Sequence, residues 1–237
     1  MALKKAKLIY EGKAKKLYET EDPDRLIIEF TDEAASLDGK KKGVIRDKGI
    51  VNNKMSEYIF KFLESYHIPT HFEETISDRE MVVKRLEMIP IEVIVRNVAT
   101  GSLCTKYGCK DGEDLRYPII EFYLKNDELH DPMMNEYHAA AFGLASPEEM
   151  KTIVRYATKV NALLKSFFIR RKVRLVDFKL EFGRFHGELM LGDEISPDTC
   201  RFWDLDTGEE LDKDRFRLDM GKVEEAYQEM LRRVLKL

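Results

Sequence analysis

The stretch LVDFKLEFG, residues 175–183, constrains the fold of this chain more than any other segment. Its side chains alternate with the period of two that is typical of a β-strand. One face carries Val176, Phe178, Leu180 and Phe182, and the other carries Asp177, Lys179 and Glu181. The apolar face predicts a strand packed on a core, whereas the row of acid, base and acid on the other face needs a separate explanation.

The segment that follows predicts a hairpin. Gly183 and Gly187 bracket a short turn, so residues 188–194 are expected to return as the partner strand. In the expected register Asp193 lies opposite or diagonal to Asp177, at about 5 Å if the two are directly opposed.

Three carboxylates, those of Asp177, Glu181 and Asp193, are then expected to converge beside Lys179. Carboxylates this close repel one another unless a cation lies among them. Mg²⁺ prefers hard oxygen ligands and keeps waters and phosphate oxygens as partners. The cluster therefore predicts a metal and nucleotide site; the alternative is the solvated polar face of an antiparallel sheet, with surface ion pairs.

Hydrophobic periodicity elsewhere predicts strands early in the chain and helices later. Strands are expected within the first thirty residues and at 81–86, 91–98 and 119–125. Amphipathic helices are expected at 50–66, after Ser146, and at the C-terminus. The sequence Ser-Pro-Glu-Glu at 146–149 has the form of a capping box with proline at the first helical position. This order of elements predicts an α+β protein of two lobes.

The composition excludes several classes of protein. With 43% apolar and 35% charged residues the chain is neither disordered nor fibrous, and 237 residues fit one large domain or two lobes. A net charge of −4 gives no general attraction for nucleic acid or an anionic membrane. Three cysteines without CxxC spacing predict a reduced compartment. No signal peptide or membrane span is recognisable, so we expect a soluble, cytoplasmic protein.

Several basic side chains are candidates for anion binding. Lys13 and Lys15 follow Gly12 on one side of a strand, where they can approach phosphates. The alternative is an edge strand protected by lysines. Neither G-x-x-x-x-G-K-[ST] nor G-x-G-x-x-G occurs in the chain.

Two arginine-bearing turns are further candidates. Arg96 ends a hydrophobic strand that turns through Gly101 into Ser102, and Arg201 lies in a second turn. A guanidinium fork, a hydroxyl and backbone N–H groups together suit an oxyanion. Each arginine is about as often a structural partner of a nearby acid.

The loop LKNDELHDP, residues 124–132, is polar and follows a predicted strand. Loops on a rigid scaffold often carry functional side chains, and this one contributes Lys125 and Asp131 as candidates. A lone loop histidine is more often structural, which is the favoured interpretation of His130.

Six blocks of the sequence together resemble one known family. These blocks are EGKAKKLYE, VNNK, RNVATGSL, LKNDELHDP, VDFKLEFG and LGDEISPDTCRFWD, in that order. They are similar to phosphoribosylaminoimidazole-succinocarboxamide synthase (SAICAR synthetase) over about residues 8–217. The resemblance implies an ATP-dependent ligase of purine biosynthesis that joins the carboxylate of carboxyaminoimidazole ribotide (CAIR) to the amine of L-aspartate, giving SAICAR, ADP and phosphate.

The resemblance also implies a fold and an assembly. A small antiparallel N-terminal lobe, residues 1–88, would cover ATP. A larger lobe, residues 89–237, would hold the ribotide, aspartate and Mg²⁺, with a cleft like that of protein kinases between the lobes. The partners would be these small molecules, with no nucleic acid and no membrane, and we expect a homodimer or a higher homo-oligomer.

The site residues are carried over from the resemblance. ATP would contact Lys13, Lys15, Lys125 and the backbone of Lys84 and Leu86, with Glu181 and Asp193 holding Mg²⁺. The ribotide would lie among Arg96, Ser102, Asp177, Lys179 and Arg201, with the arginines and Ser102 on its phosphate. Asp38 and Asp131 would lie near the junction of ribotide and aspartate, and Lys179, Asp177 and Asp131 are the predicted catalytic residues.

The chemistry is consistent with these residue types. A carboxylate is a poor electrophile and is most simply activated as an acyl phosphate, which needs positioning and charge neutralisation rather than a nucleophilic side chain. A small-molecule kinase with a similar cleft is the nearest alternative enzyme. A regulatory module that binds ATP without chemistry is the alternative from another class, and nucleic-acid binding is poorly supported.

Overall fold

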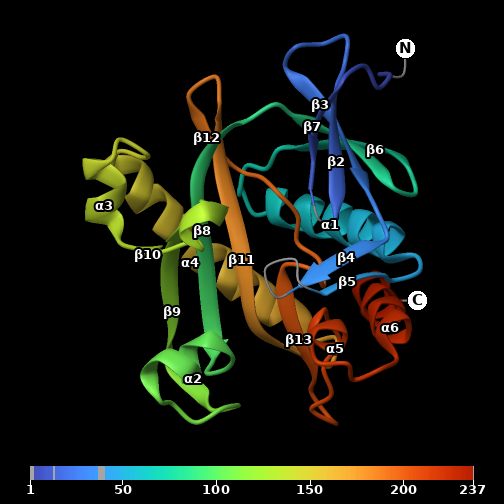
Figure 1. The fold of residues 1–237 in the computed structure, drawn as a ribbon, viewed down its shortest axis with the longest axis vertical. Helices are drawn as coiled ribbons and strands as arrows, with labels where there is room; N and C mark the ends of the chain where they lie inside the picture. The colour runs from blue at the N-terminus through green and yellow to red at the C-terminus, as the bar shows by residue number, and fades with distance from the viewer. Residues whose placement is uncertain (1–2, 13, 37–40, 237) are drawn as a thin grey trace.

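Two antiparallel β-sheets form the framework of the computed structural model, which describes residues 3–12, 14–36 and 41–236 (Figure 1). Two predicted site residues, Lys13 and Asp38, lie outside the described residues. No helix in the described part of the chain is long and apolar enough to span a membrane.

The first sheet contains five strands in the order β1–β2–β3–β7–β6, with every neighbouring pair antiparallel. The strands are β1 (Leu8–Glu11), β2 (Lys15–Glu19), β3 (Arg25–Phe30), β6 (Phe72–Ser77) and β7 (Glu80–Lys84). Helix α1 (Lys48–Glu64) packs against β3 and β6. A separate hairpin is formed by β4 (Glu33–Ser36) and β5 (Lys41–Val44).

The second sheet has the order β10–β9–β8–β11–β12, and β13 also pairs with β11. The strands are β8 (Glu87–Val98), β9 (Asp114–Leu124), β10 (Met133–Met134), β11 (Val173–Phe185), β12 (Glu188–Leu191) and β13 (Cys200–Asp204). Helix α4 (Pro147–Ile169) packs against β11 and β8, and α3 (Glu136–Ala141) packs against α4. The other helices are α2 (Ser102–Tyr107), a 3₁₀ turn at Asp127–Leu129, α5 (Asp214–Arg217) and α6 (Val223–Leu235), which packs against α1.

Local signals account for the start of α4. The Ser146 hydroxyl accepts a hydrogen bond from the Glu149 N–H at 3.1 Å, and the Glu149 carboxylate accepts one from the Ser146 N–H at 2.7 Å. This reciprocal pair is the predicted capping box, so the sequence correctly located the first turn of the helix.

One hydrophobic core joins the two sheets. Phe30 and Met81 of the first sheet belong to the same cluster of buried apolar side chains as Val93 and Phe178 of the second. The predicted α+β class with antiparallel sheets is confirmed. The division into lobes at residue 88 stays a prediction.

Strand β11 lies between β8 on one side and β12 and β13 on the other. The predicted apolar face is buried, with Phe178, Leu180 and Phe182 each 1% exposed. The charged face is buried as well, because Asp177 and Glu181 are only 5% and 4% exposed. The alternative of a solvated polar face is therefore wrong for these two carboxylates.

The predicted hairpin exists, but its register differs from the expectation. Strand β12 pairs with residues 182–185 of β11. Asp177, further back along β11, pairs with Arg96 on β8 and with Arg201 on β13. The prediction that Asp193 faces Asp177 is wrong, because β12 ends before Asp193 and the chain forms a new strand, β13, beside this part of β11.

Candidate active site

Lys179, in the middle of β11, is the centre of a chain of ion pairs. Its ammonium group contacts the carboxylate of Glu181 at 2.5 Å and that of Asp193 at 3.0 Å. Glu181 also accepts a hydrogen bond from Lys125, which follows β9. Burial favours a lower pKa for Lys179, but Asp193 and Glu181 outweigh it and raise that pKa well above its usual value. Four predicted site residues are thus linked in one chain of ion pairs.

Lys15, at the start of β2, extends this chain of ion pairs to the first sheet. Its ammonium group contacts Asp193 and lies 3.2 Å from Glu194. Burial favours the neutral amine of Lys15, yet the two carboxylates raise its pKa. In the same way, burial favours protonation of Asp193, but Lys15 and Lys179 hold its pKa well below the usual range. These charged side chains connect the two sheets.

Asp193 combines two unusual features. Its backbone has φ 60°, a left-handed conformation that non-glycine residues seldom adopt. Its Oδ2 atom is buried and lies within ion-pair distance of Lys179, but it has no hydrogen-bond partner among the described residues. A buried carboxylate oxygen with unused acceptor capacity is able to bind a cation.

The carboxylates of Glu181 and Asp193 fit a magnesium site. Across the described residues, no group of three or more His, Cys, Asp or Glu side chains is arranged to hold a metal ion. Mg²⁺ does not need such a group, because it is commonly bound through one or two carboxylates together with water and substrate phosphates. Two carboxylates linked by Lys179 are compatible with this requirement.

Asp177 belongs to a second cluster, formed with two arginines. Arg96 lies 3.3 Å from Asp177 and 2.7 Å from Glu121, and Arg201 lies 2.8 Å from Asp177 and 2.6 Å from Asp214. Burial alone lowers the pKa of Arg201, but Asp177 and Asp214 outweigh it and raise that pKa. Carboxylates thus fix both guanidinium groups in defined orientations. The expected convergence of all three acids on Lys179 is wrong, since Asp177 contacts the arginines instead.

The turn before α2 completes the arginine cluster. The Arg96 guanidinium donates to the Ser102 hydroxyl at 3.0 Å. Gly101 has φ 56°, and a Cβ atom there would lie 3.3 Å from the Arg201 guanidinium, so glycine permits the close approach. The two arginines and Ser102 come together as an anion-binding group would require.

The two residues predicted to face adenine lie at the end of β7 and in the link to β8. The backbone N–H of Lys84 donates to the carbonyl of His71 at 2.7 Å. No backbone hydrogen bond in the described part of the chain involves Leu86, so its N–H and C=O remain available to a ligand. A Cβ at Gly183 would lie 2.8 Å from Cβ of Leu86, so this glycine lets β11 approach the link.

Asp131 has a structural contact in this arrangement. Its carboxylate accepts a hydrogen bond from the backbone N–H of Asn126 at 2.8 Å, which closes the loop after β9. None of the ion pairs described here joins Asp131 to Lys179 or Asp177. Its predicted catalytic role stays a prediction.

Sequence reasoning did not identify a buried polar network next to Asp193. The Glu194 carboxylate accepts from the Ser196 hydroxyl at 2.6 Å. Asp198 pairs with Lys48 at 2.8 Å and accepts from the Tyr227 hydroxyl at 2.6 Å. Lys48 belongs to α1 and Tyr227 to α6, so the partners are distant in sequence. The density of polar residues in GDEISPDT was the available signal.

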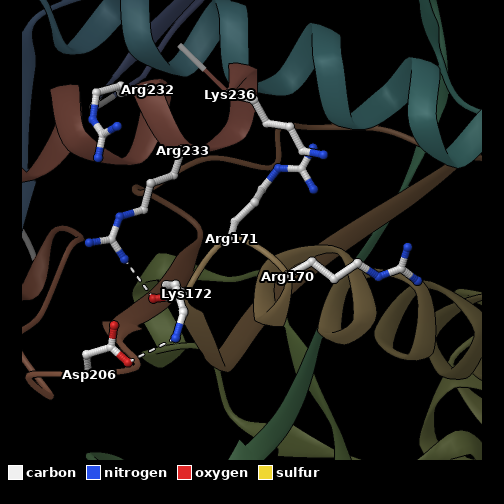
Figure 2. A pocket seen from close by; sticks show the side chains of 7 residues that line it. All are labelled: Arg170, Arg171, Lys172, Asp206, Arg232, Arg233 and Lys236. Atoms are coloured by element: carbon white, nitrogen blue, oxygen red, sulfur yellow. Dashed lines mark hydrogen bonds and ion pairs between the residues drawn. The ribbon is translucent and has the colours of Figure 1, made fainter.

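A pocket of about 380 Å³ lies apart from these residues, where α4 and α6 end. Its lining is mostly basic and consists of Arg170, Arg171, Lys172, Asp206, Arg232, Arg233 and Lys236 (Figure 2). Helix C-termini attract cations, and Arg171 donates to the carbonyls of Phe167 in α4 and Val234 in α6. We interpret the pocket as the place where the C-terminal ends of two helices pack together, and not as part of the candidate site.

Comparisons with known proteins agree on one family. Residues 8–234 match the family model described as SAICAR synthetase. A phosphoribosylaminoimidazole-succinocarboxamide synthase of Prosthecochloris aestuarii is 58% identical over 235 residues, which cover 99% of this chain and 100% of that one.

Solved structures give the same result. The synthase from Ehrlichia chaffeensis has a TM-score of 0.95 and 43% identity, covering 98% of this chain and 99% of its own. A SAICAR synthetase solved in complex with ADP has a TM-score of 0.94 and 48% identity, covering 96% of this chain and 97% of its own.

Proposed function

Because this chain belongs to the SAICAR synthetase family of purine-biosynthesis ligases, we propose that it condenses the carboxylate of CAIR with the amine of L-aspartate at the expense of ATP. The products are SAICAR, ADP and phosphate. The observation that carries the proposal is the pair of adjoining clusters on β11, one rich in lysines and carboxylates and the other built from two arginines.

The lysine and carboxylate cluster is suited to MgATP. Lys15, Lys125 and Lys179 present ammonium groups for the phosphates, and Glu181 and Asp193 would hold the metal. Bound there, Mg²⁺ would neutralise phosphate charge.

Support for the nucleotide comes from the ADP complex of a related synthetase, and from the available backbone groups of Leu86 for the base. We assign Lys13 and Lys84 to the same ligand, as the resemblance implies.

The arginine cluster is suited to the ribotide. Arg96, Arg201 and Ser102 bring two guanidinium groups and a hydroxyl together, and guanidinium forks suit a phosphate. Asp177 keeps both guanidinium groups in place. Lys179 lies two residues further along the same strand, and residues two apart on a strand share a face. The ribotide carboxylate would thereby lie between its own phosphate site and the phosphates of ATP.

The chemistry proceeds in two displacements. The ribotide carboxylate oxygen attacks the γ-phosphorus of ATP, the bond to the β–γ bridging oxygen breaks, and an acyl phosphate and ADP form. The aspartate amine then attacks the acyl carbon, phosphate leaves with the bonding electron pair, and the amine proton passes to solvent or a base. Lys179 stabilises the charge on the transferred group, which is a positioning and electrostatic role. Asp38 and Asp131 remain candidates near the junction.

The proposal is tested by measuring ADP release with Mg-ATP, CAIR and L-aspartate, leaving out one component at a time. We expect ADP only with the complete mixture, together with SAICAR. ADP formation with CAIR alone, and no SAICAR when aspartate is added, would favour the small-molecule kinase. ATP binding without ADP formation in any mixture would favour the regulatory module.

A further inference from the structure

Lys213, the residue that caps α5, is a buried cation without an anionic partner. It is 9% exposed, and its ammonium group forms no hydrogen bond or ion pair with any described residue. The ammonium nitrogen is not one of the fully enclosed unpartnered polar atoms, so it faces space that solvent or a ligand can enter. A buried ammonium without a partner is costly, and this cost calls for an explanation.

The backbone around Lys213 lies against the arginine cluster. Its N–H donates to the carbonyl of Pro197 at 3.2 Å. The preceding Asp212 accepts from the Phe202 N–H at 2.6 Å, and the following Asp214 ion-pairs with Arg201 at 2.6 Å. Lys213 therefore lies between the segment that follows Asp193 and the arginine that we assign to the ribotide phosphate.

The two carboxylates that act on Lys213 electrostatically have other partners. Asp198 is bound to Lys48 and Tyr227, and Glu194 to Lys15 and Ser196. These acids favour the charged form of Lys213, but burial, with Arg217 and Lys48 nearby, outweighs them and lowers its pKa. Neither Asp198 nor Glu194 therefore pairs with the ammonium group of Lys213.

We infer that Lys213 binds a carboxylate of L-aspartate, the substrate that supplies the amine. This inference rests on the proposed function, which requires a site for two further carboxylates beside the ribotide. Arg96 and Arg201 are already assigned to the ribotide phosphate, which suits the fork of a guanidinium group. A single ammonium group is a compact charge and suits one carboxylate oxygen. The alternative is a purely structural lysine, in which the aliphatic part of the side chain is buried and the ammonium group reaches water.

The test compares Lys213→Met with Lys159→Met, a matched change at an exposed lysine of α4. Lys213→Met keeps the apolar stem and removes the charge. We expect the KM for L-aspartate to rise about ten-fold or more, as for loss of a charge-assisted hydrogen bond. The KM values for CAIR and ATP should change less than about two-fold, and Lys213→Arg should recover part of the loss.

Thermal unfolding separates binding from folding. Lys213→Met removes a buried unpaired charge, so its Tm should equal or exceed that of the parent protein. If Lys213→Met does not fold, Lys213→Gln takes its place in the same comparison.

The outcomes are distinguishable. An unchanged KM for aspartate in a turning-over variant would overturn the inference and leave the proposed function intact. A rise in the KM for CAIR instead would assign Lys213 to the ribotide and also overturn it. If the parent protein itself shows no aspartate-dependent turnover, the proposed function fails and the inference fails with it.

Discussion

Replacing Lys15 by methionine should weaken both the fold and ATP binding. The Lys15 side chain is 17% exposed, and its ammonium group neutralises Asp193 and Glu194, whose side chains are 8% and 3% exposed. Removing one partner of a buried ion pair costs about 3–5 kcal/mol. Because Lys179 remains beside Asp193 and Lys15 is partly exposed, we expect a smaller loss, about 2–3 kcal/mol in the free energy of unfolding.

Thermal unfolding measures this loss directly. For a chain of this size, 1 kcal/mol shifts the Tm by about 2–4 °C, so the Tm of Lys15→Met should fall by about 4–12 °C. The matched control is Lys16→Met, the next residue on β2, which points to the opposite face and pairs with the exposed Glu11 at 2.9 Å. Its Tm should change little, because exposed ion pairs contribute little.

ATP titration supplies the functional half of the same test. The KM for ATP should rise in Lys15→Met and stay near the parent value in Lys16→Met. Equal Tm values for the two variants would refute the reasoning, since they would mean that the contact between Lys15 and the segment after β12 does not stabilise the folded protein.

Two further outcomes are expected. Glu181→Gln removes one proposed metal-binding carboxylate at constant shape and should reduce kcat by about a hundred-fold or more, with a retained cooperative melting curve; loss of folding with normal specific activity in the folded fraction would contradict the assignment. Hydrogen bonding from Arg184 is the main cause that lowers the pKa of Glu149 from 4.5 to about 2. An acid with a lowered folded-state pKa contributes stability above its unfolded value and loses it as the pH falls, here between about 4.5 and 2. Glu149→Gln should therefore lower the free energy of unfolding by about 1 kcal/mol at pH 7 after solvent screening. Measured with urea, the free energy of unfolding of the variant should also fall less steeply between about pH 4.5 and 2 than that of the parent protein. The same fall in both proteins would exclude this contribution of Glu149.

Local patterns in the sequence predicted local structure well. The period of two in residues 175–182 identified β11, and the capping box identified the first turn of α4, because both depend on neighbours in the chain. The family resemblance, carried by six blocks of sequence, is confirmed by the family match.

The partners of the charged side chains depended on distant strands. The sequence located Asp177, Arg96 and Arg201 as candidates, but their contact follows from the registers of β8 and β13 on β11. A register is set by long-range packing and cannot be read from one strand alone. For the same reason the sequence predicted the wrong partner for Asp193 and did not identify Lys213. The burial of Lys213 depends on the segment that contains Pro197, which is distant in the sequence.

If ATP and Mg²⁺ bind as we propose, the ion pairs at Asp193 link the two binding events. The Lys15 ammonium group cannot pair fully with a phosphate of ATP and with the buried Asp193 carboxylate at the same time. As Lys15 turns towards a phosphate, Asp193 loses part of its compensating charge, which is unfavourable in a buried site. A divalent cation on Asp193 and Glu181 would replace that charge, so each ligand strengthens the binding of the other by the same factor.

Calorimetry with a non-hydrolysable ATP analogue measures this linkage. Adding Mg²⁺ should lower the dissociation constant of the parent protein for the analogue by about ten-fold or more. Asp193→Asn should lose most of that dependence, since it has no buried charge to compensate, while Lys16→Met should keep it. Equal magnesium dependence in Asp193→Asn and the parent protein would mean that the metal acts only on the nucleotide in solution, and the proposed role of Asp193 would then be wrong.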